Sequence, residues 1–445
     1  MRTSTACFFP VVGYQAVIME QIAQRLILSK EVDRAIFLCP TIGAYRSVSS
    51  KFERIFLPAK VRLHDDLTIS RETLPFASYE LKKLRVEHQW NINLHITPDR
   101  LEKEAASYSL YWDQFLDDHE VRAILIWNGY FLPQQTLIGR AQKLGIPLLY
   151  LENGYEPGSF VIDPVGINAK SSFVPMWKQT NTTFVESDHP CPVTFSGKDR
   201  PFVKRILNYL AIQARIPHYR RKYGAFIRYE HSPSVFQKAR QIAQSISGTS
   251  RIPKQTRGNI VLFPLQVVTD SQLLENFHGY QEQAVLQLVE SIEKLNKDEN
   301  VPACLYIKDH PRQITIQYIR TLKKKIRSNY VVFIEGGNIQ SLIDNSTVVV
   351  TINSSVGYQA MKRKKPVIVL GESVYTGAGL ARQLHQGESL TEILKEALQN
   401  PDQFYDECTL ETFLSNYQSY CFFQNQTSLN KASQLVARYV GGESR

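Results

Sequence analysis

Short apolar runs alternate with amphipathic stretches along most of this chain. Continuous runs of this length, bounded by Gly, Pro or Asn, are typical of parallel strands that are buried on both faces. The clearest runs are 35–39, 123–127, 147–151, 260–265, 303–307, 330–334, 347–352 and 366–370. Stretches such as 281–295 and 312–326 have helical periodicity and separate several of these runs. The pattern therefore predicts an α/β protein with doubly wound sheets.

The apolar runs gather in two regions, which predicts two lobes rather than three independent domains. We expect a Rossmann-like N-terminal lobe at 1–165 and a Rossmann-like C-terminal lobe at 257–400. Between them, 166–256 is an irregular, basic segment that ends in a linker rich in Ser, Gly and Pro. The tail, 401–445, is predicted to be helical over 410–440 and to pack back on the N-terminal lobe.

The N-terminal residues superficially resemble a secretion signal. Pro10, Gly13 and Gln15 interrupt the apolar stretch, however, and no small-residue cleavage site follows. A strand at 5–12 followed by a helix at 15–27 accounts for these residues better. No run approaches the roughly 18 apolar residues needed to span a bilayer. We therefore expect a cytoplasmic protein with at most peripheral membrane contact.

One short sequence, Val-Gly-Tyr-Gln-Ala, occurs at 12–16 and again at 356–360. Each copy follows an apolar run and begins a stretch of helical periodicity. We expect two equivalent strand-to-helix turns, one in each lobe, at a cleft where helix N-termini favour anions.

The composition excludes a disordered or fibrous chain, because 43% of the 445 residues are hydrophobic and Gly and Pro are not enriched. Lys and Arg number 52 against 42 Asp and Glu, a surplus of 10 that indicates an anionic partner. Part of the surplus lies at 198–222, where tyrosines are interleaved with basic residues. This segment suits an anionic membrane surface or an acidic acceptor, although a solvated basic face accounts for it equally well. Nucleic acid is not expected, since neither a zinc finger nor an RNP-type strand is present.

The six cysteines are scattered, without CxxC or His/Cys spacing. We expect reduced, buried thiols and no metal site.

The richest cluster of polar and turn-forming residues is 151–172, which directly follows an apolar run. Ligands of open α/β sheets bind at such strand ends, so Glu152 is the first candidate for chemistry. Asn153, Gly154, Asp163 and Asn168 are candidates for the same site, with Gly154 permitting a tight turn. A glycine-rich surface loop with incidental acids is the alternative.

A second cluster follows the apolar run 303–307 and contains Lys308, His310, Pro311 and Arg312. Three potential cations around a proline-fixed turn suit a phosphate or a phosphate leaving group. A structural histidine is about equally compatible with the pattern.

Two further clusters lie at strand ends of the C-terminal lobe. Hydroxyls and backbone N–H groups suited to phosphate oxygens occur at Asn353, Ser354, Ser355 and Gly357, although Ser354 could be a simple helix cap. No Walker motif is present. The other cluster, weak by itself, contains Gln266, Asp270 and Ser271.

Together these clusters resemble the capsule polysaccharide biosynthesis family, bacterial β-Kdo transferases that use CMP-Kdo. The resemblance rests on Glu152-Asn-Gly, Asp163-x-x-Gly-x-Asn168, Ser171-Ser172, Pro264-Leu-Gln with Asp270-Ser-Gln272, Lys308-x-His-Pro311 and Thr351-Ile-Asn-Ser-Ser-Val-Gly357. The segment 365–371, Tyr375 and Gly379-Leu380 also fit, so the resemblance covers roughly 150–380 in the family's order.

The resemblance implies two Rossmann-like lobes of glycosyltransferase B type, with the active site in the cleft between them. It implies transfer of Kdo from CMP-Kdo with retention, which gives a β-Kdo linkage, and no metal or other cofactor. The acceptor would be a lipid or a Kdo-glycan of a bacterial capsule or other surface polysaccharide. The expected location is the inner face of the cytoplasmic membrane, with other capsule assembly proteins as candidate partners.

For individual residues, the resemblance implies that His310 contacts the CMP phosphate and assists its departure, while Ser354 and Ser355 hold its oxygens. Glu152 matches the first acid of the family's acidic-acidic-Gly motif, but Asn153 stands at the second position. A retaining double displacement needs a carboxylate nucleophile, so either Glu152 or Asp163 takes that role, or the site works differently from that of members with two acids. Of these alternatives we expect Glu152 as the main catalytic carboxylate and Asp163 as a supporting acid. Another CMP-ulosonate or UDP-sugar donor, or a non-catalytic lipid-binding scaffold, is the alternative function.

Overall fold

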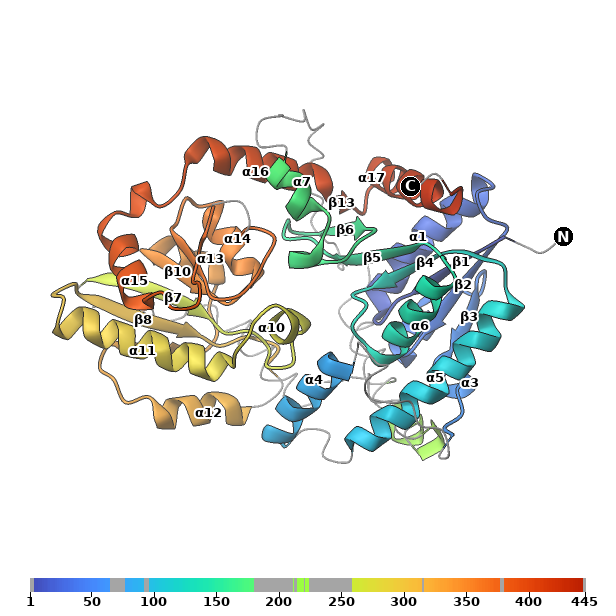
Figure 1. Ribbon diagram of the computed structural model, residues 1–445, viewed down its shortest axis with the longest axis horizontal. Helices are drawn as coiled ribbons and strands as arrows, with labels where there is room; N and C mark the ends of the chain where they lie inside the picture. Colours follow the sequence, from blue (N-terminus) through green and yellow to red (C-terminus); the bar gives the residue numbers. More distant parts are fainter. Residues whose placement is uncertain are drawn as a thin grey trace.

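The computed structural model describes residues 4–64, 77–91, 96–179, 211, 214–219, 221–223, 258–313, 316–376 and 380–442. Most of the basic segment 198–222, the linker before 257, Cys191 and Gly379 lie outside these residues. Two α/β lobes stand next to each other, the N-lobe drawn in blue and teal and the C-lobe in yellow and orange (Figure 1).

The N-lobe is built on a seven-stranded sheet in the order β13-β6-β5-β4-β1-β2-β3. Strands β1 to β5 run parallel, whereas β6 is antiparallel to β5. The strands are β1 (Thr5–Phe9), β2 (Arg34–Cys39), β3 (Glu53–Phe56), β4 (Val121–Trp127), β5 (Leu148–Asn153) and β6 (Ser159–Asp163). The helices are α1 (Gly13–Leu28), α2 (Ile42–Ser47), α3 (Leu57–Lys60), α4 (Ala77–Gln89), α5 (Pro98–Asp118) and α6 (Leu132–Lys143).

The C-lobe is built on a six-stranded sheet in the order β12-β11-β10-β7-β8-β9, and every neighbouring pair is parallel. The strands are β7 (Asn259–Pro264), β8 (Ala303–Lys308), β9 (Val331–Ile334), β10 (Val348–Thr351), β11 (Val367–Val369) and β12 (Arg382–Gln383). The helices are α10 (Ser271–Glu275), α11 (Gln281–Lys297), α12 (Ile316–Lys325), α13 (Ile339–Asn345), α14 (Ser355–Met361) and α15 (Leu390–Gln399).

Both lobes have the same winding. With the strands of each lobe counted from its own start, both sheets follow the order 3-2-1-4-5-6 of a Rossmann fold. Apolar side chains fill both faces of each sheet, as the continuous runs in the sequence require. The predicted fold class, two Rossmann-like lobes, is confirmed, and all eight apolar runs form strands.

The chain crosses between the lobes several times. Helix α4 lies between them, and Trp90 at its end packs edge-on against Tyr318 of the C-lobe, with ring centroids 5.1 Å apart (Figure 1). Helices α7 (Phe173–Gln179) and α16 (Glu407–Tyr420) share aromatic contacts beside the C-lobe sheet. The N-terminal and C-terminal sequence regions therefore do not coincide with the two packed bodies.

The tail returns to the N-lobe through β13 (Phe422–Phe423), which pairs antiparallel with β6, and α17 (Gln426–Val440), which packs on α1. Arg25 of α1 donates hydrogen bonds to Asn430 at 2.9 Å and to Gln426 at 2.8 Å. The prediction of helix throughout 410–440 is wrong at β13, because Phe422 and Phe423 extend the sheet and Asn425 then caps a new helix.

Among the described residues, no helix is long and apolar enough to cross a membrane. The described cysteines are free thiols; Cys7, Cys39, Cys304 and Cys421 are buried as predicted, whereas Cys408 is exposed. In the same part of the chain, no group of three or more His, Cys, Asp or Glu side chains is arranged to hold a metal ion.

Candidate functional site between the lobes

The switch points of the two sheets meet where the lobes face each other. In each lobe, the strand order reverses between two neighbouring strands, β1 and β4 in the N-lobe and β7 and β10 in the C-lobe. Ligands of such sheets bind beyond the carboxyl ends of these strands. Asn128, just after β4, donates from Nδ2 to Glu152 Oε2 at 2.8 Å and to Ser271 Oγ at 3.1 Å. One amide therefore links the candidate carboxylate of the N-lobe to the C-lobe.

Glu152, the penultimate residue of β5, is a half-buried carboxylate at this boundary. Its Oε1 accepts from the backbone N–H of Asn153 at 2.8 Å, opposite the Oε2 contact with Asn128. Burial raises the pKa of Glu152 above its ordinary value, these two hydrogen bonds oppose the rise, and the nearby Asp270 carboxylate adds to it. The result is a carboxylate held in one orientation and more basic than a surface glutamate.

Both copies of the repeated five-residue sequence lie at the start of a helix, α1 or α14, as predicted. The two turns are not equivalent, however, because Val12 caps α1 whereas Val356 is already the second residue of α14. Asn153 Nδ2 donates to the hydroxyl of Tyr14, from the first copy, at 3.0 Å. Tyr358, from the second copy, donates to Glu156 Oε1 at 2.5 Å. Both tyrosines therefore contact the segment that follows Glu152, one from each lobe.

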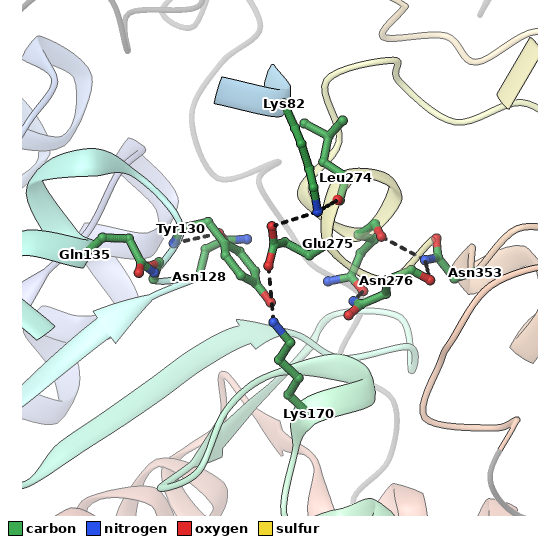
Figure 2. Close-up of polar contacts among 11 residues, drawn as sticks. Lys82, Asn128, Tyr130, Gln135, Lys170, Leu274, Glu275, Asn276 and Asn353 are labelled. Atoms are coloured by element: carbon green, nitrogen blue, oxygen red, sulfur yellow. Dashed lines mark hydrogen bonds and ion pairs between the residues drawn. The ribbon is translucent and has the colours of Figure 1, made fainter. Parts of the chain in front are cut away.

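Ion pairs also join the two lobes, and in each pair the carboxylate is largely buried while the lysine is partly exposed. The Glu156 carboxylate accepts from Lys362 Nζ at 2.7 Å. The carboxylate of Glu275 in α10 lies 3.2 Å from Lys170 Nζ and 4.0 Å from Lys82 Nζ of α4. Lys82 Nζ also donates to the carbonyl of Leu274 at 3.2 Å. Figure 2 shows Lys82 and Lys170 approaching Glu275 from opposite sides. These contacts fix the spacing between the lobes in this conformation.

Asp163 holds the loop behind Glu152. Its side chain has no exposed surface. The carboxylate accepts from the backbone N–H groups of Val165 and Gly166 at 2.7 and 2.9 Å, from the backbone N–H and hydroxyl of Ser172 at 2.7 and 2.8 Å, and from the Tyr420 hydroxyl. These five donors give Asp163 a structural role in the loop, and the role as a supporting acid that we predicted for it stays a prediction.

Gly154 and Asn168 shape the same loop. A Cβ atom on Gly154 would lie 2.1 Å from Ser159 Oγ, so no larger residue fits without a shift. Asn168 adopts a left-handed conformation with φ 56° at the start of a short 3-10 helix, η2 (Asn168–Lys170). Both residues therefore position the loop, and the predicted contact of their own atoms with a substrate stays a prediction.

In the C-lobe, Gln266 and Asn353 bind each other across the switch point. Gln266 Nε2 donates to Asn353 Oδ1 at 2.9 Å, and Asn353 Nδ2 donates to the carbonyl of Gln272 at 2.8 Å. Asp270 caps α10 by accepting from the backbone N–H of Gln272 at 2.9 Å, and burial raises its pKa. These hydrogen bonds hold together the segments that follow β7 and β10, which contain the candidate site residues of the C-lobe.

The turn after β8 presents the predicted cations. Lys308 is buried and donates to the carbonyl of Asp309 at 2.7 Å, and burial lowers its pKa. His310 Nδ1 accepts the backbone N–H of Arg312 at 3.0 Å. Burial, and then the charges of Arg312 and Lys308, lower the pKa of His310 to about 4. At neutral pH the ring is therefore uncharged with its proton on Nε2, a hydrogen-bond donor. Pro311 is exposed at the tip of the turn.

The serine turn after β10 is held from behind by Tyr375, whose hydroxyl donates to the carbonyl of Ser354 at 2.5 Å. Ser354 caps α14 by accepting from the backbone N–H of Val356 at 3.2 Å, while Ser355 is exposed. A Cβ atom on Gly357 would lie 2.5 Å from the Tyr375 hydroxyl, which explains the glycine. The cap role that the sequence left open for Ser354 is therefore present, and Ser355 keeps an exposed hydroxyl.

Sequence reasoning missed the residues that join the lobes, above all Asn128, Glu156 and Tyr14. Asn128 has a positive φ of 72° and precedes Gly129, so an Asn-Gly pair directly after a buried strand was the available signal.

The charges of both lobes act on Tyr14. Burial and then the Glu152 carboxylate raise the pKa of Tyr14, and the positive charge of Arg312 in the C-lobe lowers it by less.

Two Rossmann-like lobes with candidate residues at facing switch points define a protein of glycosyltransferase B type architecture. The chain belongs to the capsule polysaccharide biosynthesis protein family, which matches residues 123–423. The family predicted from the motifs is thus confirmed.

Individual relatives are distant. Protein FixF of Sinorhizobium fredii is 26% identical over 66% of this chain, which spans only 58% of FixF. Capsule polysaccharide modification protein LipB of Neisseria meningitidis serogroup B is 21% identical over 73% of this chain and 82% of LipB. Among solved structures, the KpsC β-Kdo 2,4 transferase of Thermosulfurimonas dismutans is 16% identical, with 72% of this chain and 88% of that one covered and a TM-score of 0.39.

Proposed function

We propose that this protein is a glycosyltransferase that moves Kdo from CMP-Kdo to a lipid or glycan acceptor in bacterial capsule or surface polysaccharide biosynthesis, with retention of configuration. The observation that carries the proposal is the position of Glu152. This half-buried carboxylate lies at the boundary between the lobes, where Asn128 donates hydrogen bonds both to it and to Ser271 of the C-lobe. The turn that contains His310 lies in the opposite lobe. A nucleophile and a set of phosphate-binding groups on facing lobes suit transfer of a sugar from a nucleotide.

In the proposed first step, a Glu152 carboxylate oxygen bonds to the anomeric carbon of Kdo. The bond from that carbon to the CMP phosphate breaks, and its electron pair leaves with CMP. In the second step, an acceptor hydroxyl oxygen bonds to the same carbon, and the ester to Glu152 breaks. The hydroxyl proton passes to a phosphate oxygen of the bound CMP. Two displacements at one carbon retain its configuration.

The proposal assigns stabilisation of the leaving CMP phosphate to the C-lobe turns rather than to a metal ion. His310 donates from Nε2, Ser355 from its hydroxyl, and Lys308 and Arg312 supply positive charge. A neutral His310 donates a hydrogen bond without repelling these two cations. Asn353, Gly357 and Pro311 act by shaping the two turns.

We further propose that the protein works at the inner face of the cytoplasmic membrane, where a lipid or membrane-bound glycan acceptor is presented. The basic surplus of 10 charges favours an anionic membrane surface and an anionic acceptor. Contacts with other capsule assembly proteins belong to the same proposal.

Thermal stabilisation tests the choice of donor, because a ligand stabilises the native state only if it binds there. CMP at about one hundred times its Kd should add about 2.7 kcal/mol to the free energy of unfolding, while UDP at the same concentration should add little. Release of CMP from CMP-Kdo should then depend on the acceptor. Stabilisation by UDP alone would favour a different donor, and absence of turnover with every lipid-anchor and Kdo-glycan acceptor would contradict the transferase.

Replacing His310 with alanine should weaken CMP binding about tenfold, because one charge-assisted hydrogen bond to a phosphate is lost. Calorimetric titration of CMP measures the change. His385, an exposed histidine of the same lobe, provides the control, since His385→Ala should leave the Kd within twofold. Equal affinities of the His310→Ala variant and the wild-type protein would remove His310 from the phosphate site.

His310 should also make stability depend on pH. Its folded pKa of about 4 lies below the ordinary 6.5, so between these values the unfolded chain binds more protons than the native state. The free energy of unfolding should therefore fall as the pH drops from 6.5 to 4, by at most about 3 kcal/mol from this residue, and should not change on its account above 6.5. Urea unfolding of the wild-type protein and of His310→Gln at pH 4.5 and 7.5 measures the difference, and parallel pH curves would contradict the prediction.

A further inference from the structure

A cavity of about 570 Å³ lies in the N-lobe where β2 and β3 end. Its walls carry three arginines and three tyrosines: Arg46, Arg54, Arg215, Tyr45, Tyr219 and Tyr223. Among the described residues that line it, none is acidic. The proposed transfer site at Glu152 uses none of these residues.

One wall of this cavity comes from the basic segment singled out in the sequence. Arg215, Tyr219 and Tyr223 recur every four residues, so they share one helix face. The face is anchored to the N-lobe by aromatic contacts: the Phe56 ring centroid lies 5.7 Å from those of Tyr219 and Tyr223, and Ile216 is buried beside them. This part of the basic segment therefore packs on the N-lobe, and its Arg215 side chain forms part of the cavity wall.

The opposite wall contains an arginine whose position is fixed. Arg54 Nη1 donates to the carbonyls of Tyr45 and Val48 at 3.0 and 2.9 Å, and its guanidinium lies 4.6 Å from the Tyr45 ring centroid. Its Nε and Nη2 have no acceptor in the described part of the chain. Arg46 and Arg215 are exposed at the same cavity. One guanidinium group held by two backbone carbonyls and two exposed ones, with no acidic residue among the described residues of the lining, suit a phosphate or carboxylate group.

We infer that this cavity binds an anionic group of the acceptor, a phosphate or a carboxylate, while the tyrosine rings pack against the adjoining sugar or glycerol carbons. The inference rests on the proposed function, whose acceptor it describes more closely. The cavity and Glu152 lie at the same carboxyl edge of one sheet, and three to four strand spacings of about 4.8 Å separate β2 and β3 from β5. An acceptor that reaches both sites must therefore carry its anionic group on the order of 15–20 Å from the reacting hydroxyl. A Kdo oligosaccharide, or a phospholipid headgroup already extended by Kdo residues, has this length, whereas a bare phosphatidylglycerol headgroup would occupy the cavity alone.

Direct binding to the full chain tests this site. The probes are monomeric dihexanoyl-phosphatidylglycerol, which represents a lipid headgroup, and a Kdo oligosaccharide, which represents a carboxylate-bearing glycan. At least one probe should bind, and Arg46→Gln and Arg215→Gln should each weaken that binding about tenfold. Arg221 is an exposed arginine of the same helical segment that does not line the cavity, so Arg221→Gln should change the Kd less than twofold.

Binding of the phospholipid alone would identify a headgroup site, and binding of the oligosaccharide alone a glycan site; either result supports the inference. It would be overturned if neither probe bound, or if Arg221→Gln weakened binding as much as the two cavity variants. Stabilisation by CMP is measured on the same variants and should be unchanged. Failure of CMP to stabilise the wild-type protein would contradict the proposed transferase while leaving the result at this cavity intact.

Discussion

Replacing Glu152 with glutamine should abolish glycosyl transfer while leaving CMP affinity within twofold. An amide has nearly the shape of the carboxylate, and its oxygen can still accept from Asn128 or Asn153. It cannot form the ester that the proposed double displacement requires, so kcat should fall at least about 10³-fold. Single-turnover measurement of CMP release, together with calorimetric titration of CMP, separates the chemical step from binding.

Glu156 offers a matched control four residues along the same segment. Its carboxylate accepts from Tyr358 and Lys362 of the C-lobe, so Glu156→Gln should weaken the connection between the lobes and lower the melting temperature. It should retain turnover at temperatures where it is folded. If Glu152→Gln kept more than a tenth of wild-type turnover, or if both variants lost activity equally, Glu152 would not be the nucleophile.

Replacing Asp163 with asparagine should destabilise the fold by about 3 kcal/mol or more. One acceptor oxygen becomes an NH₂ group inside a fully buried site, where five donors already converge. Buried donors that lose a charged acceptor are among the costliest polar defects in proteins. Urea unfolding measures the loss, and turnover per folded molecule should change only a few-fold.

The control for Asp163 is Asp298, an exposed acid at the end of α11. Asp298→Asn should change the free energy of unfolding by no more than about 0.5 kcal/mol, as is usual for exposed positions. A stable Asp163→Asn protein with greatly reduced kcat would contradict the structural role and restore Asp163 as a catalytic acid.

The fold was predictable where burial alone decides local structure. Runs such as 303–307 and 348–350 lie inside a sheet whose two faces are both covered, so their positions are apolar. Strand β3 was missed because its sequence begins with Glu53-Arg54, and those charges are compatible with a strand only through partners elsewhere, Arg34 for Glu53 and the carbonyls of Tyr45 and Val48 for Arg54. Tertiary contacts of this kind leave no periodic signal.

The candidate site was predictable only in part. Motifs at strand ends placed Glu152 and His310 at carboxyl edges of their sheets, because topology brings such positions to one face. Partners that depend on how the lobes face each other were not predictable: Asn128 acquires its role only through Ser271 of the other lobe. Nor could the spacing of Asp163 reveal that the loop folds its N–H groups around the carboxylate.

The identity of the product tests the central claim most directly. Purified protein is incubated with CMP-Kdo and either lyso-phosphatidylglycerol or a Kdo-terminated glycan, and the product is characterised by mass and by the anomeric configuration of the new linkage. The proposed mechanism predicts the mass of one or more added Kdo residues in β linkage, and no product with Glu152→Gln. An α-linked product, or no transfer to either acceptor by the wild-type protein, would contradict it.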